Sequence, residues 1–129
     1  MTGNETLSGG QLSAAISDEI VRILSEHTGR GPTRAKTTIS DSLIACVLED
    51  TLTRGERNLV EGGRESLVLE MRSNFQAVMK TDCVEAVERL SGRKVRAFMS
   101  QNNIAPDLGV ELFVMEPNGD GAAAVESDT

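Results

Sequence analysis

Hydrophobic residues that recur every three or four positions predict a first helix over residues 10–28. Gly29 is expected to end this helix, because glycine readily adopts the left-handed conformation of a C-cap, and Pro32 prevents continuation. His27 is interpreted as a partly buried structural residue, with a ligand-binding or pH-sensing role as the alternative. The apolar stripe consists of Leu12, Ile16, Ile20, Ile23 and His27.

Two runs of β-branched and aliphatic residues, 35–40 and 43–49, predict a β-hairpin. Asp41 and Ser42 separate them and suit a tight turn. The second run is apolar at every position from 43 to 48, a pattern typical of a strand that is covered on both faces.

Two helices are expected next, over residues 54–61 and 64–91. Thr53 and Glu56 have the spacing of a capping box at the start of the first, and Gly92 is expected to end the second. The apolar stripe of the longer helix is predicted to contain Val68, Met71, Phe75, Met79, Cys83, Ala86 or Val87, and Leu90.

Residues 94–101 and 109–116 predict a second hairpin. In the first of these strands the alternation places three residues on each side, Val95, Ala97 and Met99 against Lys94, Arg96 and Phe98. The order of helix, hairpin, two helices and hairpin predicts an α+β fold, in which a mostly antiparallel four-stranded sheet packs against the helices.

The length of 129 residues fits one domain. Residues 1–9 and 117–129 are polar, Gly-rich or acidic and contain few large apolar side chains, so both are predicted to be disordered tails. A single domain over residues 10–116 remains. Because two of its strands are apolar on both faces and only three helices are available, we expect a homodimer to cover the free face or edge of the sheet.

Composition excludes several classes of function. A net charge of −7 and only three aromatic residues, all Phe, argue against nucleic-acid binding. Cys46 and Cys83 are far apart in sequence and are interpreted as small buried hydrophobes, with a disulfide as the alternative. The single histidine makes a zinc site improbable. Without a signal-like or membrane-spanning apolar run, we expect a cytoplasmic protein that does not insert into a membrane.

The residues after the first helix form the main candidate site. Arg30, Gly31, Arg34 and Lys36 concentrate cations and glycine in an otherwise acidic chain. Arginine can bind a carboxylate or phosphate through two parallel hydrogen bonds, so these four residues are candidate ligands for an anion. The alternative is a helix stop followed by a loop with solvated charges.

Glu61, Gly62, Gly63 and Arg64 join the two later helices and form a second candidate site. They could contact a partner or an anion at a helix N-terminus. Alternatively, they are a structural hinge that needs the conformational freedom of glycine.

No catalytic constellation is recognisable. The paired carboxylates, such as Glu85 with Glu88, are helix neighbours on a charged face, and a Ser-His-Asp triad is improbable with one histidine and no GxSxG motif. We therefore expect no catalytic residues, no metal and no cofactor.

Several short motifs, in their order along the chain, resemble the MpsC-like family. They are Gly29-Arg30-Gly31-Pro32 with the Ala-Lys-Thr-Thr-Ile that follows, Leu52-Thr53 with Glu56 and Leu59, Glu61-Gly62-Gly63-Arg64, Leu90 with Gly92-Arg93 and Val95, and Pro106-Asp107. The similarity covers about residues 10–117.

This resemblance implies a soluble companion of a membrane system for cation translocation and bicarbonate supply, and it supplies no site residues. The predicted function is therefore a non-enzymatic regulatory or accessory domain that contacts a membrane-transport protein. The alternative is a sensor of a small anionic ligand or nucleotide at the Gly-Arg-Gly-Pro loop. A weaker option is an enzyme that uses a serine or carboxylate indistinguishable from surface residues.

Overall fold

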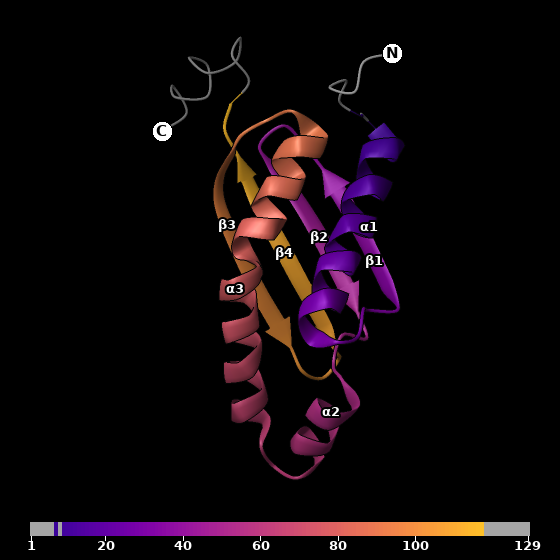
Figure 1. Ribbon diagram of the computed structural model, residues 1–129, viewed down its shortest axis with the longest axis vertical. Helices are drawn as coiled ribbons and strands as arrows, with labels where there is room; N and C mark the ends of the chain where they lie inside the picture. Colours follow the sequence, from indigo (N-terminus) through magenta and orange to yellow (C-terminus); the bar gives the residue numbers. More distant parts are fainter. Residues whose placement is uncertain (1–6, 8, 118–129) are drawn as a thin grey trace.

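Three helices and four strands follow one another in the predicted order in the computed structural model, which describes Leu7 and residues 9–117 (Figure 1). Apart from Leu7, Gly9 and Pro117, the predicted tails lie outside the described residues. The α+β prediction is confirmed. The elements are α1 (Gly9–Thr28), β1 (Arg34–Ile39), β2 (Leu43–Glu49), α2 (Arg54–Glu61), α3 (Glu65–Ser91), β3 (Val95–Asn103) and β4 (Leu108–Met115).

The local signals that begin and end the helices have the predicted geometry. Thr53 and Glu56 form the reciprocal capping box of α2. Gly29 and Gly92 follow α1 and α3 with φ of 84° and 71°, a left-handed conformation that favours glycine. Each of these glycines donates its backbone N–H to a carbonyl of the last helical turn.

The four strands form one antiparallel sheet in the order β1-β2-β4-β3. The two hairpins therefore meet through their second strands, β2 and β4. Ile44 pairs with Phe113, and Phe98 pairs with the same Phe113 from the other side. The centroids of the two phenylalanine rings lie 5.1 Å apart, and Phe113 at the centre of the sheet is the largest fully buried side chain among the described residues.

Helices α1 and α3 cover one face of this sheet (Figure 1). The core between them includes Ile16, Ile20, Ile23, Ile44, Leu48, Met79, Val87 and Phe113. Burial of each large aliphatic side chain contributes about 1.5–3 kcal/mol, so this layer is the main source of stability. Cys46 and Cys83 belong to the same layer as free, buried thiols, which confirms their interpretation as small hydrophobes.

The other face of the sheet, here called the open sheet face, is not covered by any described residue. The alternation of β2, β4 and β3 directs nine apolar side chains to it, and two large ones are strongly exposed, Val47 at 42% and Met99 at 50%. The prediction that both faces of the second strand are covered is thus wrong within the described chain. The nine are Leu43, Ala45, Val47, Ala97, Met99, Leu108, Val110, Leu112 and Val114.

The predicted alternation of the third strand is wrong because β3 contains a bulge. Val95 pairs with Met115 and Ala97 with Val114, so Arg96 is an extra residue without a partner. Beyond the bulge the sides exchange. Val95 and Phe98 both pack against the core, while Met99 is on the open sheet face.

Helix α3 extends beyond the end of the sheet, where it packs against α2 (Figure 1). Its buried stripe also differs from the prediction. Met71 and Phe75 are only half-buried, whereas Arg72 is buried. A charged residue therefore takes an inward position where α3 leaves the sheet.

Candidate functional site

The loop after α1 connects that helix to the segment between β2 and α2. The Nη1 atom of Arg30 donates to the backbone oxygens of Asp50, at 2.6 Å, and Leu52, at 3.0 Å. Its Nη2 atom donates to Oδ2 of Asp50 at 2.8 Å. All of these acceptors belong to the chain itself, so the guanidinium of Arg30 has a structural role in holding the β2–α2 segment.

The other three candidate anion ligands have different neighbours. Gly31 lies against α1, since a Cβ atom there would be 3.0 Å from Oγ of Ser25. Arg34 and Lys36 are exposed and alternate with the buried Thr37, which places them on the open side of β1. The structure therefore gives these residues and Arg30 separate surroundings, and an anion-binding role for them stays a prediction.

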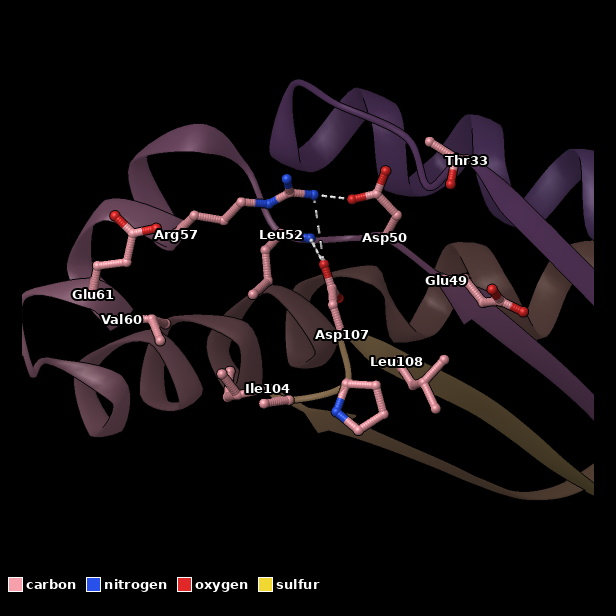
Figure 2. Close-up of a pocket in the computed structure, with 12 residues that line it drawn as sticks. Thr33, Glu49, Asp50, Leu52, Arg57, Val60, Glu61, Ile104, Asp107 and Leu108 are labelled. Carbon is pink, nitrogen blue, oxygen red and sulfur yellow. Dashed lines mark hydrogen bonds and ion pairs between the residues drawn. The ribbon is translucent and has the colours of Figure 1, made fainter.

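A pocket of about 490 Å³ lies between α2, the β2–α2 segment and the turn between β3 and β4 (Figure 2). Its apolar lining consists of Leu52, Val60, Ile104, Ala105, Pro106 and Leu108. Four carboxylates and one guanidinium also line it, from Glu49, Asp50, Glu61, Asp107 and Arg57. An apolar surface bordered by a few charged groups is typical of a binding site.

Asp50 and Asp107 fix the shape of one wall of this pocket. Asp50 has a φ of 60° and accepts from both Arg57 and Arg30. Asp107 accepts from the backbone N–H of Leu52 through Oδ2 and from the hydroxyl of Thr51 through Oδ1, each at 3.0 Å. The Asp107 carboxylate also lies 3.8 Å from Nη2 of Arg57. A dashed line in Figure 2 marks this ion pair. These bonds tie the β3–β4 turn to the β2–α2 segment.

Behind this wall, α2 and α3 are joined by a buried ion pair. Arg72 and Glu56 are each about 3% exposed, and Nη2 of Arg72 lies 2.6 Å from Oε1 of Glu56. The same Nη2 atom donates to the backbone oxygen of Thr51. The Glu56 oxygen also accepts from the Thr53 N–H, so one carboxylate caps α2 and pairs with α3.

A second buried carboxylate, Glu111, points from β4 toward the helices. Its Oε1 atom and the neighbouring Oγ of Ser100 have no hydrogen-bond partner among the described residues. Burial raises the pKa of Glu111 to about 7, and the nearby hydroxyl of Ser100 and the positive charge of Arg72 oppose this effect only in part. The group therefore changes its protonation state near neutral pH.

Sequence reasoning missed these buried charges. The signal was present in the spacing, because Arg72 follows Val68 by four residues and Glu111 alternates with Phe113 and Met115 on the inner side of β4. Asp50 and Asp107 gave no such signal. Their partners are backbone atoms and guanidinium groups contributed by distant segments.

The second candidate site, residues 61–64, lies on the surface between α2 and α3. All four residues are exposed, and Gly63 has a φ of 83°. The N–H groups of Gly62, Gly63 and Arg64 donate to carbonyls of the last turn of α2. This geometry needs glycine at position 63, and the role of the segment as a hinge or a partner contact stays a prediction.

His27 and the two thiols complete the list of candidate reactive groups. The Nε2 atom of His27 lies 3.2 Å from Asp82, so this half-buried histidine joins the end of α1 to α3. Burial raises the pKa of Cys46 and that of Cys83, the latter to about 12. Among the described residues, no three His, Cys, Asp or Glu side chains are grouped as they would need to be for metal binding.

The fold and its surfaces define a small α+β domain with an open apolar sheet face and a pocket at the end of the sheet. In the described part of the chain, no helix combines the length and the apolar character needed to cross a membrane. The chain belongs to the MpsC family, since the model of that family, described as Na+-translocating membrane potential-generating system (MpsC), matches residues 8–117. No match was found among curated proteins, and none among solved structures.

Proposed function

We propose that this protein is a non-enzymatic, cytoplasmic accessory domain of a Na+-translocating membrane system, and that it dimerises through its open sheet face. The membership of the MpsC family supports the link to such a system. The observation that carries the protein-contact role is the exposure of the large apolar side chains of Val47 and Met99 on the open sheet face.

A second copy of the chain is the occupant that fits this face best. The outward positions of the two central strands hold only apolar side chains from Leu43 to Val47 and from Leu108 to Val114. Charges lie at the border, with Arg34 and Lys36 on β1 and Glu49 at the end of β2. Two such faces can form a sandwich, with an apolar centre and a charged rim.

The size of the face sets the expected affinity. Four strands spaced by ~4.8 Å, with about seven residues each at ~3.4 Å, give a surface of roughly 450 Å². Two copies would bury roughly 900 Å², slightly below the ≈ 1,000 Å² expected of a stable interface. The proposal is therefore a reversible dimer that dissociates on dilution.

The function is assigned to binding rather than to catalysis. Asp50 and Asp107, two of the four carboxylates at the pocket, already accept hydrogen bonds from the protein's own backbone or guanidinium groups. His27, the single histidine, pairs with Asp82 at the surface. These groups stabilise the fold, and general acid–base catalysis would need them free to exchange protons with a substrate.

Light scattering after size exclusion tests the dimer. The wild-type chain of 13.8 kDa should have twice this mass at high micromolar concentration and approach it on dilution. Val47→Glu should remain monomeric because it places a charge in the apolar centre. Val78→Glu is the matched control, since Val78 is 66% exposed on α3. A wild-type monomer at millimolar concentration, or equal effects of both variants, would contradict the proposal.

A deletion strain of the native host tests the link to the membrane system. We expect the loss of the Na+-dependent part of the membrane potential, measured with a potential-sensitive dye with and without Na+. The chain with Val78→Glu should restore it, whereas the chain with Val47→Glu should not. An unchanged Na+-dependent potential in the deletion strain would overturn the assignment to this system.

A further inference from the structure

The pocket between α2 and the β3–β4 turn is explained neither by the packing of the core nor by the proposed role of the open sheet face. Its volume of about 490 Å³ is within the ≈ 300–1,000 Å³ of ligand pockets. Leu52, Val60, Ile104, Pro106 and Leu108 form a continuous apolar lining that comes from three separate segments. Such a lining can hold an aliphatic side chain but offers little to a fully hydrated ion.

The charged groups around this lining differ in whether they already have a partner within the protein. Arg57 is the one cation among the lining residues, and it is already paired with Asp50. Asp107 is bound to the β2–α2 segment. By contrast, Glu49 and Glu61 make no side-chain hydrogen bond or ion pair with any described residue. Two carboxylates at opposite parts of the rim are therefore available to a ligand.

Arg34 is the nearest candidate to neutralise Glu49, because the two residues pair across β1 and β2. Their charged groups nevertheless do not approach within ion-pair distance, whereas Arg30 and Arg57 both reach Asp50. The negative rim thus persists, and the net charge of −7 of the whole chain adds to the attraction of cations.

We propose that this pocket binds a short, basic and apolar peptide segment of a partner protein. An aliphatic side chain of the segment lies on Ile104, Pro106 and Leu108, and its neighbouring Lys or Arg side chains pair with Glu61 and Glu49. This inference rests on the proposed protein-contact function and names the chemistry of the contact. Glu49 and Leu108 are also the terminal outward positions of β2 and β4, so the pocket adjoins the open sheet face without being part of its apolar centre.

The wall of the pocket is organised before a partner arrives. Asp107, Arg30 and Arg57 fix the β2–α2 segment, and the buried pair of Arg72 and Glu56 fixes α2. Little conformational entropy is then lost on binding, which favours measurable affinity even for a short peptide.

A titration of the full-length, ¹⁵N-labelled protein tests this site. The probe is acetyl-Leu-Arg-Leu-Arg-Leu-amide, compared with the same peptide carrying Glu for Arg and with acetyl-Gly-Arg-Gly-Arg-Gly-amide. We expect saturable shifts of the amide signals of Val60, Glu61, Ile104 and Asp107 with the first peptide only. Equal shifts with the acidic peptide, equal shifts with the glycine peptide, or no shift up to several millimolar would each overturn the proposal.

Charge variants locate the contact. Glu61→Gln should weaken binding of the first peptide about 2- to 5-fold, the usual range for an exposed ion pair, and Glu49→Gln should act similarly. Glu85→Gln is the control, because it removes the same charge from the exposed surface of α3. Equal weakening by Glu85→Gln would show that the effect comes from the overall charge of the protein, and it would refute the site. Diffusion measured on the same samples reports the dimer separately, so failure here is distinguishable from failure of the sheet-face proposal.

Discussion

The buried pair of Arg72 and Glu56 makes the sharpest prediction of the structure. Arg72→Met keeps most of the aliphatic volume of the side chain but removes its charge and donors. Glu56 would then remain buried, with the Thr53 N–H as its described donor, and the backbone oxygen of Thr51 would lose its bond to Arg72. Removal of one partner from a buried pair costs about 3–5 kcal/mol, because it leaves an uncompensated charge in a low-dielectric environment.

This loss is a large fraction of the stability of the domain. A chain of this size unfolds with a free energy of about 5–15 kcal/mol, so Arg72→Met should remove at least about a fifth of it. At roughly 4 °C for each kcal/mol, the melting temperature should fall by about 12–20 °C. Urea unfolding followed by circular dichroism at 222 nm is the assay, since the chain has no Trp or Tyr for fluorescence.

Two further variants separate a lost ion pair from lost packing. Arg54→Met, at an exposed position of α2, should change the free energy of unfolding by no more than about 0.5 kcal/mol. The double variant Glu56→Gln with Arg72→Met should lose less unfolding free energy than the sum of the two single variants, because Glu56→Gln removes the charge that Arg72→Met leaves unpaired. A loss below about 1 kcal/mol for Arg72→Met, or strict additivity in the double variant, would refute the reasoning.

Three further predictions follow from other parts of the structure. Gly31→Ala should destabilise the protein by about 1–3 kcal/mol in urea unfolding, because its Cβ would lie 3.0 Å from Ser25 Oγ and 3.2 Å from Val21 Cγ1. Gly10→Ala, where no atom lies within 4 Å of the added Cβ, should be neutral or slightly stabilising, and equal effects of the two variants would contradict this prediction. A thiol reagent at pH 8 should label Cys46 and Cys83 only after unfolding, because both are buried and burial raises their pKa values; rapid labelling of the folded protein would show that this layer opens. Burial raises the pKa of Glu111 to about 7, so the folded state binds this proton more tightly than the unfolded state, and the free energy of unfolding should fall by about 3 kcal/mol as the pH rises from about 4.5 through 7. In Glu111→Gln this component of the pH dependence should disappear, and an unchanged profile in the variant would exclude Glu111 as its source.

Local patterns were sufficient to predict most of the elements. The three- and four-residue spacing of Leu12, Ile16, Ile20 and Ile23 defines α1, because a helix that covers a sheet needs one continuous apolar side. Thr53, Glu56 and Gly92 place helix ends correctly, since their side chain or backbone freedom acts within one turn. Such signals depend on neighbours in sequence and can therefore be recognised without knowledge of the fold.

Features that depend on distant segments could not be predicted in the same way. The bulge at Arg96 reverses which residues of β3 face the core from that point on, and no local sequence preference at that position predicts it. The pairing of β2 with β4 decides the strand order, and it depends on how the two hairpins meet. Arg72 is absent from the predicted buried stripe of α3, since an isolated arginine is normally exposed. Only a buried acceptor such as Glu56 makes its inward position favourable.

The location of the polar network has a geometric cause. The 27 residues of α3 span about 40 Å, whereas the 9 residues of β3, the longest strand, span about 30 Å, so the N-terminal part of α3 cannot pack on the sheet. There the β2–α2 segment takes the place of the sheet. Its backbone carbonyls are withdrawn from water and have no strand partner, so they need donors, which Arg72 and Arg30 supply. The same bonds hold α2 at the angle that forms the pocket. It follows that Arg72→Met should weaken peptide binding at the pocket even though Arg72 does not line it, because a mobile α2 must be ordered again when the peptide binds.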